Sequence, residues 1–494
     1  MFGDEQKEYG DYQTPIGFCE EVCIYIRDNY ISSPKAIIEP TCGRGNFLKA
    51  AITTFNCPNV YGIEINKQYV QEAQKENPSA VIVNKNIFET NIKQVCSEED
   101  VLLIGNPPWA TNSNLSYNLP QKENFKGLRG FDALTGSSNF DICEYIILQL
   151  LNEYKNTNSI LCLLCKTSVA RNVLLEIDRK SIYCKNIEIL NFNSNKVFGI
   201  SASACIFVVN LSKEQPITKS TVCHVKDFIK DEYLDTLEVF NGTLKSCTQQ
   251  NSLDGKCQLV WRQGVKHDCG RIMELDYING TFVNKNGESV NIEEDRIFPL
   301  VKSSHFKSPI INSFKKFVIV TQDKPKQNTE YIQRDFPLTW EYLNSHIEDF
   351  NKRKSIIYKS SPPFSMFGIG EYSFAPYKVG LSGFYKKPLF CLLYGEKPVM
   401  TDDTAYFLGF DDYDIAYSVM ILLNSAKVQE FLSSIAFLDN KRPYTIKLLS
   451  RIDFNKCIKK VSFTHLSETE ELLGLKKYIT ELKFEKFKNL IQKT

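Results

Sequence analysis

Residues 36–65 read AIIEPTCGRGNFLKAAITTFNCPNVYGIEI, and this stretch decides the fold class. It opens on a short apolar run at 36–39, turns at two glycines, and ends on a second apolar run at 60–65. Between the runs, apolar residues recur at the spacing of one helix face, namely Phe47, Leu48, Ala51 and Phe55. We therefore expect a strand, a tight loop, a helix and a second strand, which is the repeating unit of an α/β fold.

The same alternation continues outward through the first 220 residues. Further strands are expected at 80–83, 101–105, 159–165, 186–192 and 203–211, with helices at 67–76 and 140–154. Strands that alternate with helices predict a doubly wound, mostly parallel sheet with helices on both faces. Residues 110–139 lack any periodicity, which in a compact domain is typical of a functional loop or lid. Residues 1–220 are thus predicted to form one α/β domain.

The loop after the first strand suits a nucleoside. Gly43 and Gly45 allow the backbone to turn sharply and to approach a ligand closely. Glu64 ends the second strand, 21 residues after Gly43, where a carboxylate can bind the two hydroxyls of a ribose. Leu48 stands where a dinucleotide-binding fingerprint has its third glycine, and no Gly-Lys-Ser/Thr of a P-loop follows. The pattern therefore favours a nucleoside cofactor over a dinucleotide or a nucleoside triphosphate.

A stiff polar corner, Asn106-Pro107-Pro108-Trp109, follows the strand at 101–105. Proline fixes its own φ and holds the preceding residue extended, so Asn106 is expected at a defined angle. The Asn106 amide oxygen and the Pro107 carbonyl can together accept both hydrogens of an exocyclic amino group. Trp109 offers a flat surface on which a planar group can stack. The alternative is a purely structural turn with a buried tryptophan.

Taken in order, these motifs resemble the gamma-class DNA adenine-N6 methyltransferases of bacterial restriction-modification systems. Five motifs within the first 210 residues carry the resemblance: Tyr12-Gln13-Thr14-Pro15, EPTCGRGNFL at 39–48, Glu64, Asn106-Pro107-Pro108-Trp109, and Val197-Phe198. In that family the last pair supplies an aromatic ring that stacks on the target base. As an ordered set the motifs are specific, although each alone is weak.

The resemblance implies a class I methyltransferase fold with S-adenosylmethionine as cofactor. The implied catalytic residues are Asn106, Pro107, Pro108 and Trp109, and Trp109 and Phe198 would stack on an adenine rotated out of the duplex. The implied cofactor-binding residues are Thr14, Glu39, Thr41, Cys42, Gly43, Gly45, Glu64, Ile65, Asn86, Ile87 and Asn106. No metal is expected, because the cofactor itself carries the activated methyl group.

Two positions depart from the family pattern. Asn86 stands where the family has an aspartate that reaches the cofactor's adenine. An amide can still hydrogen-bond to an adenine amino group, so we expect altered cofactor affinity and retained function. Arg44 occupies a position in the glycine loop where a small residue is usual, and the sequence offers no account of it.

Residues 221–494 are predicted to form an α+β domain that, by the same resemblance, recognises double-stranded DNA. Basic and aromatic residues mix in two stretches, 302–320 and 351–374. Basic groups suit phosphates and aromatic rings suit bases, although a solvated face with core aromatics would read the same way. The aromatic residues of the second stretch are Tyr358, Phe364, Phe367, Tyr372 and Phe374. Apolar residues at helical spacing between Leu472 and Ile491 predict a final amphipathic helix.

Other readings share parts of this pattern. An RNA base amine stays open as a substrate, because stacking and basic residues serve both nucleic acids. A protein glutamine amide is disfavoured, since enzymes of that kind usually lack a large carboxy-terminal domain. A non-catalytic DNA-binding subunit would have no need of the intact corner at 106–109. A fused nuclease would require an acidic-plus-lysine cluster that the sequence does not display.

Composition places the chain among ordinary cytoplasmic proteins. The net charge is +1, and 16 cysteines are scattered through apolar segments, as expected for reduced, buried thiols. The first residues do not resemble a signal peptide, and no apolar run approaches the ~18 residues of a membrane span. We expect a monomer or weak dimer whose partners are double-stranded DNA and a cognate restriction endonuclease acting on the same site.

Overall fold

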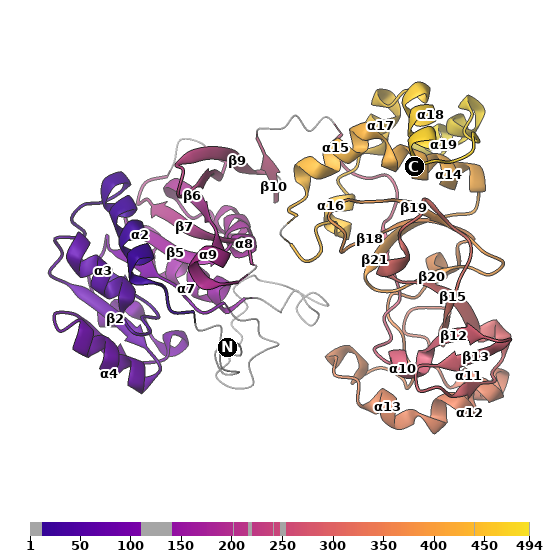
Figure 1. Cartoon of the computed structure of the whole chain (residues 1–494), viewed down its shortest axis with the longest axis horizontal. Helices are drawn as coiled ribbons and strands as arrows, with labels where there is room; N and C mark the ends of the chain where they lie inside the picture. Colours follow the sequence, from indigo (N-terminus) through magenta and orange to yellow (C-terminus); the bar gives the residue numbers. More distant parts are fainter. Residues whose placement is uncertain are drawn as a thin grey trace. The chain divides into compact units, whose positions relative to one another are not determined.

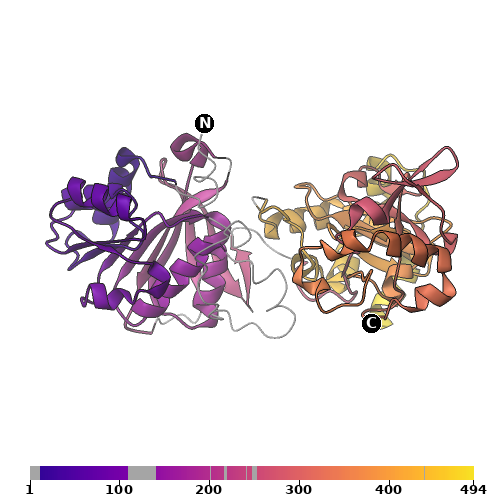
Figure 2. The same cartoon turned by 90° about the horizontal axis from the view of Figure 1, so that it is seen from below.

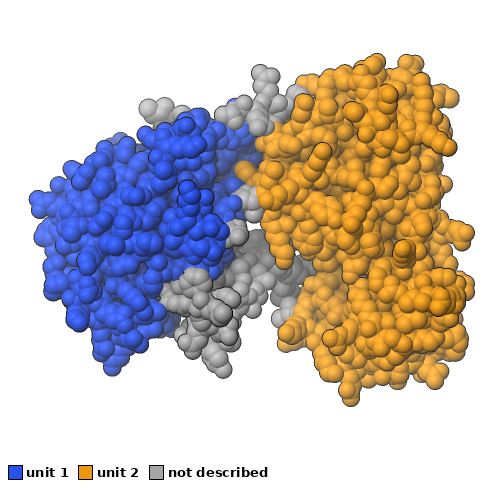
Figure 3. Space-filling model, viewed as in Figure 1, with its two compact units in different colours: residues 1–249 blue, residues 250–494 orange. Residues whose placement is uncertain are grey.

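The computed structural model describes residues 12–109, 141–200, 202–215, 220–240, 242–247, 253–438 and 440–493. The chain forms two compact units, residues 1–249 and 250–494 (Figure 3). The sequence places this boundary at residue 220. The structure places it later because β8 (Val222–Asp227), β9 (Glu232–Phe240) and β10 (Thr243–Ser246) extend the sheet of the first unit. The loop predicted at 110–139 lies outside the described residues.

A ten-stranded sheet runs through the first unit in the order β10-β9-β8-β6-β7-β5-β4-β1-β2-β3 (Figure 1). Its other strands are β1 (Ile37–Glu39), β2 (Val60–Glu64), β3 (Val81–Asn84), β4 (Leu102–Gly105), β5 (Ile160–Lys166), β6 (Cys184–Phe192) and β7 (Ala204–Leu211). Strands β3, β2, β1, β4 and β5 are parallel, whereas β7 is antiparallel to β5 and β6. The sheet is therefore mixed, and its parallel half carries the predicted cofactor loop.

Helices cover both faces of this sheet. They are α2 (Ile16–Asn29), α3 (Asn46–Thr54), α4 (Lys67–Glu76), α5 (Ile92–Val95), α7 (Ile142–Tyr154), α8 (Thr167–Arg179) and α9 (Ser194–Phe198). The step from β1 to β2 runs one way along the sheet and the step from β4 to β5 runs the other way. Right-handed crossovers then place α3 and α7 on opposite faces (Figure 2). Strands β4 and β5 are accordingly buried almost throughout.

Parallel pairing brings the functional loops together. The register sets Glu39 of β1 beside Gly62 of β2, and Ile38 beside Leu103 of β4. The segments that follow β1, β2, β4 and β5 thus leave the sheet at the same edge. Open α/β sheets bind their ligands at this edge, beyond the carboxyl ends of the strands.

The second unit contains two smaller sheets and a group of helices. The five-stranded sheet has the order β11-β21-β18-β19-β16, and the six-stranded sheet has the order β14-β13-β12-β17-β15-β20. The strands are β11 (Arg262–Gln263), β12 (Glu274–Ile278), β13 (Thr281–Asn284), β14 (Ser289–Val290), β15 (Ile297–Val301), β16 (Ile310–Ile311), β17 (Lys316–Ile319), β18 (Tyr377–Ser382), β19 (Cys391–Leu393), β20 (Met400–Thr401) and β21 (Ala405–Phe410).

Helix α14 (Tyr413–Asn424) is the centre of the second unit. It is buried along most of its length and contacts α18 (Phe463–Leu472), α19 (Glu481–Lys493) and three strands of the five-stranded sheet. The other helices are α10 (Gly270–Met273), α11 (Tyr331–Asp335), α12 (Pro337–Ser345), α13 (Ile347–Asn351), α15 (Ala426–Ile435), α16 (Ile446–Leu449) and α17 (Phe454–Lys460). The unit therefore combines strands and helices, as the sequence predicts.

Candidate active site

The loop after β1 turns through two glycines with positive φ. Gly43 has a φ of +51° and Gly45 has a φ of +84°, values that favour glycine. A Cβ on Gly45 would lie only 2.5 Å from Nδ2 of Asn77, an amide that donates to the Gly45 carbonyl at 3.2 Å. The loop is thereby pressed against the end of α4, and helix α3 begins directly after it.

The Glu64 carboxylate joins the two loops that leave β1 and β2. Its Oε2 accepts from the Gly43 N–H at 2.9 Å, and its Oε1 accepts from the Asn66 N–H at 2.7 Å. A carboxylate at the end of the second strand of an open α/β sheet is the group that binds the hydroxyls of a ribose in nucleoside sites. This geometry fits the nucleoside predicted from the sequence.

Three buried side-chain oxygens at this edge of the sheet have no hydrogen-bond partner among the described residues: Glu39 Oε2, Thr41 Oγ1 and Asn106 Oδ1. Glu39 is wholly buried, and its Cγ would lie 3.0 Å from a Cβ built on Gly105, at the end of β4. Burial raises the pKa of Glu39 well above its usual range, and only a backbone N–H of Leu48 opposes this shift. Buried polar atoms normally have partners, so this cluster indicates that a polar ligand completes the site.

The Asn106 side chain is held in one orientation by the amino-terminal segment. Its Nδ2 donates to the Tyr12 carbonyl at 2.9 Å and to the Thr14 Oγ1 at 3.2 Å. Both amide hydrogens therefore have an acceptor, and the unpartnered Oδ1 remains available to a substrate. The structure thus gives Thr14 a contact with the predicted catalytic asparagine that the sequence did not suggest.

Trp109 and Phe198, the two residues predicted to stack on a base, contact each other, and Tyr12 contacts both. The Trp109 and Phe198 ring centroids are 5.5 Å apart, and the Tyr12 ring is 6.1 Å from each of them. A base stacked between two rings needs about 7 Å, twice a ~3.5 Å contact. Trp109 and Phe198 instead meet nearly edge to face, at 74°. A base stacked between Trp109 and Phe198 would therefore require these two rings to separate.

The structure gives a role to each of the two residues that depart from the family pattern, Asn86 and Arg44. The Asn86 Oδ1 accepts from the Phe88 N–H at 3.1 Å and caps the short helix Ile87–Glu89. An aspartate would serve equally well in this role. Arg44 points away from the loop, where its Nε lies 3.1 Å from Oε2 of Glu72 and its guanidinium is 5.2 Å from the Tyr69 ring centroid. Arg44 therefore fastens the loop to α4.

The remaining predicted cofactor residues are part of the scaffold around the loop. Cys42 is buried, and a Cβ on Gly62 would lie 2.9 Å from its Sγ, so the thiol fills the space between β1 and β2. Desolvation, reinforced by the nearby Glu39, raises the pKa of Cys42 far above its usual value, which keeps the thiol protonated. Ile65 is 52% exposed at the end of β2, where it offers an apolar surface. Ile87 is buried beneath the Asn86 turn.

Sequence reasoning missed two residues behind the corner. Lys166 ends β5, and its Nζ lies 3.2 Å from the Trp109 carbonyl and 2.6 Å from Oδ2 of Asp141. Asp141 precedes α7 and caps it through the Cys143 N–H at 3.1 Å. Only the capping signal of an aspartate before an apolar helix was visible in the sequence, because the contacts of Lys166 span many residues.

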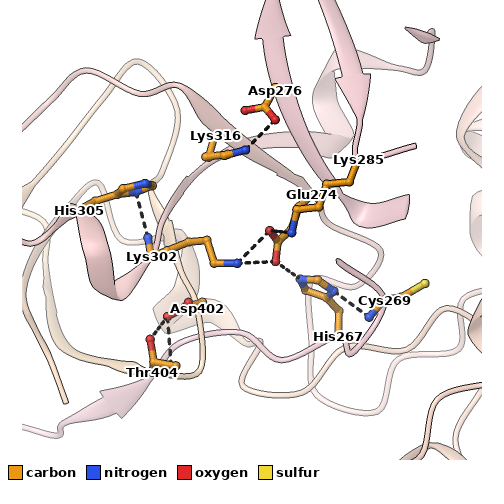
Figure 4. A network of polar contacts seen from close by, with 10 residues as sticks. All are labelled: His267, Cys269, Glu274, Asp276, Lys285, Lys302, His305, Lys316, Asp402 and Thr404. Atoms are coloured by element: carbon orange, nitrogen blue, oxygen red, sulfur yellow. Dashed lines mark hydrogen bonds and ion pairs between the residues drawn. The ribbon is translucent and has the colours of Figure 1, made fainter. Parts of the chain in front are cut away.

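A second polar cluster lies in the second unit, around Glu274 (Figure 4). The Glu274 carboxylate accepts from Lys285 Nζ at 2.5 Å and from Lys302 Nζ at 2.9 Å, and His267 Nε2 is 3.7 Å away. Burial outweighs the attraction of Glu274 and lowers the pKa of His267 to about 4. The carboxylate is paired with two ammonium groups and burial keeps the histidine neutral, so the polar groups of this cluster satisfy one another. Within the described residues, no group of His, Cys, Asp and Glu side chains could hold a metal ion.

Comparison with known proteins decides the family. A relative from a Nostoc species, described as type II methyltransferase M.NspV, is 37% identical over 468 residues, which cover 90% of this chain and 96% of the relative. The chain belongs to the type II methyltransferases. Its cofactor is S-adenosylmethionine, which the glycine loop, Glu64 and the unpartnered Glu39 oxygen fit in chemistry.

A solved structure shares the fold of this methyltransferase. The type IIL restriction-modification enzyme MmeI in complex with DNA gives a TM-score of 0.55 at 13% identity, covering 100% of this chain and 80% of that chain. At this identity the likeness shows the fold alone. A scan against protein-family models finds no match. Among the described residues, no helix has the length and apolar character needed to cross a membrane.

Proposed function

We propose that the protein is a gamma-class DNA methyltransferase that transfers a methyl group to the N6 amine of an adenine flipped out of double-stranded DNA. The carrying observation is the buried, unpartnered Oδ1 of Asn106, whose amide orientation is set by Tyr12 and Thr14. An acceptor in this position, next to the Pro107 carbonyl in the chain, matches the two hydrogens of an exocyclic amine.

The corner positions the amine for direct displacement. When bound, S-adenosylmethionine supplies a methyl group on a sulfonium, whose leaving group is a neutral thioether. Asn106 and the Pro107 carbonyl accept the N6 hydrogens, which turns the nitrogen lone pair toward that methyl carbon. Transfer to the amine held by Asn106 and Pro107 would form an N–C bond as the C–S bond breaks, with the electron pair left on sulfur and one N6 proton released to solvent. The protein contributes mainly position and electrostatics.

Each side of the site has a proposed task. Glu64 would bind the ribose hydroxyls, with Gly43 and Gly45 bringing the backbone close to the cofactor. The Glu39 carboxyl would meet the ammonium of the cofactor's methionine part, which would supply the partner that its Oε2 lacks. Trp109 and Phe198 would hold the adenine after the ring cluster opens.

The second unit is proposed to recognise the DNA sequence, in a system where a cognate endonuclease cuts the unmodified site. The aromatic residues predicted to meet bases fit this role only in part, because Tyr358 and Phe364 are buried in the core. A more exposed candidate is the basic-aromatic patch formed by Phe384, Tyr385, Lys386, Lys387, Lys441 and Arg442. The Arg442 guanidinium lies 5.0 Å from the Phe384 ring centroid, and Tyr385 is 36% exposed.

Labelled S-adenosylmethionine tests this function. The protein is incubated with DNA, RNA or bulk protein, and the methylated product is identified by hydrolysis and mass spectrometry. We expect label in DNA as N6-methyladenine, and a loss of at least 100-fold, about 2.7 kcal/mol, in Asn106→Ala. The matched control is Asn59→Ala, at the opposite end of the strands, where the side chain bonds only the Lys35 carbonyl among the described residues.

Three outcomes would overturn the proposal. Label confined to RNA or protein would refute the substrate class. Methylcytosine as the product would refute the target base. Unimpaired transfer by Asn106→Ala would refute the role of the corner, whatever the substrate.

A further inference from the structure

Lys166 fastens the catalytic corner from behind. It is the last residue of β5, and its Nζ donates to the Trp109 carbonyl at 3.2 Å. The Trp109 indole N–H also donates to β5, reaching the Leu164 carbonyl at 3.4 Å. The backbone and the side chain of Trp109 are therefore both attached to the neighbouring strand.

Asp141 holds Lys166 in place. Its side chain is 8% exposed, and its Oδ2 lies 2.6 Å from Lys166 Nζ. The other oxygen, Oδ1, accepts from the Cys143 N–H and fixes the carboxylate to the start of α7. Lys166 is 27% exposed, and its Nζ bonds to Asp141 Oδ2 and to the Trp109 carbonyl. An ammonium bridged between a buried carboxylate and one carbonyl is restricted to a single position.

We propose that Lys166 is a positioning residue for methyl transfer, acting on Asn106 through the carbonyl of Trp109. Pro107 and Pro108 have fixed φ values, so the segment from Asn106 to Trp109 moves nearly as one body. One end of this body continues from β4 through Gly105, whose φ of +152° only glycine adopts readily. The other end is Trp109, held by Lys166 and the indole bond.

Loss of the Lys166 contact would let the corner pivot about Gly105. The inference rests on the proposed function, because it assumes that the Asn106 acceptor meets the amine at one angle. A misplacement of ~1 Å in such a site costs about 100-fold in rate. Cofactor binding would change little, since within the described residues the bonds of Lys166 go to Trp109 and Asp141.

The chain offers a matched control for a merely structural ion pair. Lys226 lies 2.8 Å from Glu188, with side-chain exposures of 27% and 6% against 27% and 8% for Lys166 and Asp141. The Lys226 pair joins β8 to β6, and no contact between it and residues 106–109 occurs within the described part of the chain. Lys226→Met should therefore cost stability as Lys166→Met does, without affecting transfer.

The experiment compares Lys166→Met, Lys166→Arg, Asp141→Asn and Lys226→Met in the full chain. Single-turnover methyl transfer is measured at saturating cofactor, together with equilibrium cofactor binding and thermal unfolding. The substrate is the one that the wild-type protein labels, so failure of DNA as a substrate would leave this test in place. We expect Lys166→Met to lose 10- to 100-fold in single-turnover rate, with cofactor affinity within about twofold.

The other variants sharpen the result. Lys166→Arg should recover part of the rate, Asp141→Asn should fall between, and Lys226→Met should transfer at the wild-type rate. Wild-type transfer by Lys166→Met, or an equal loss in Lys226→Met, would overturn the proposal. If Lys166→Met does not fold, Asp141→Asn decides by the same criteria, because asparagine can still cap α7 but carries no charge for Lys166.

Discussion

At the scale of single residues, the central observation is that the side-chain amide of Asn106 is held in one orientation. An asparagine side chain can present either its oxygen or its nitrogen to a ligand, and only its bonding neighbours decide which. Here the Tyr12 carbonyl and the Thr14 hydroxyl take both hydrogens of Nδ2, so Asn106 presents Oδ1. The segment matched as a cofactor motif therefore also orients the predicted catalytic group.

Thr14→Val tests this second role. Valine keeps the shape of the side chain but removes the acceptor, and Thr14 is only 5% exposed, so water cannot easily replace it. We expect kcat to fall about tenfold, equivalent to ~1.4 kcal/mol, while the dissociation constant of S-adenosylmethionine stays within about twofold. Thr14→Ser, which restores the hydroxyl, should recover most of kcat. A rise in the dissociation constant with unchanged kcat would instead assign Thr14 to the cofactor alone.

At the scale of secondary-structure elements, the sequence predicts best what local spacing determines. The strand, loop and helix from Ile37 to Thr54 form as expected, because two glycines and an apolar helix face lie within one short stretch. The prediction of a single final helix between Leu472 and Ile491 was wrong. Helix α18 ends at Leu472, Gly474 adopts a φ of +68°, and α19 begins only at Glu481. Leu472 is 86% exposed, so its helical spacing did not reflect burial.

Contacts between elements that are far apart in the chain could not be predicted from local sequence patterns. The domain boundary was placed too early because the pairing of β8 with β6 depends on residues far apart in the chain, which local spacing does not reveal. Tyr358 and Phe364 looked available to bases but pack into the second unit's core. The role of Lys166 was missed for the same reason, because its acceptors at residues 109 and 141 are far from it in the sequence and come close only in the folded chain.

The Glu274 cluster makes the second unit sensitive to acid. His267 has a folded pKa of about 4, below the ~6.5 of an unfolded histidine, because burial disfavours its charged form. Above pH 6.5, His267 is neutral in both the folded and the unfolded chain, so it does not lower the free energy of unfolding. As the pH falls toward 4, His267 binds a proton in the unfolded chain but stays neutral in the folded chain. The free energy of unfolding therefore falls by up to about 3 kcal/mol.

His267→Asn should flatten this dependence. Asparagine can still accept the Cys269 N–H, a bond of 3.2 Å in the wild-type protein, but it does not titrate. Urea unfolding followed by tryptophan fluorescence at pH 7, 6, 5 and 4.5 measures the effect, since Trp261 and Trp340 both lie in the second unit. His465→Asn, at a half-buried position of α18, is the control. An unchanged pH slope in His267→Asn would contradict the assignment.

At the scale of the whole molecule, the net charge of +1 conceals an uneven surface. In the second unit, two loops bring Lys386 and Lys387 near Lys441 and Arg442, and the Tyr444 hydroxyl ties the loops together through the Lys386 carbonyl at 3.1 Å. The Phe384 ring lies beneath Arg442 and Lys441, which holds both cations at the surface. Fixed cations lose less entropy when they bind phosphates than mobile ones do.

If this patch meets the DNA backbone, its removal should change the salt dependence of binding. Each lost phosphate contact lowers the slope of log K against log salt by about 0.9, so Lys386→Gln/Lys387→Gln should reduce it by about 2. The control, Lys476→Gln/Lys477→Gln, removes two adjacent exposed lysines from another loop of the same unit. Fluorescence anisotropy with labelled duplex DNA between 50 and 300 mM salt gives both slopes. Equal slopes in both variants would place the phosphate contacts elsewhere, while a selective loss would assign the two loops to DNA even before the recognition sequence is known.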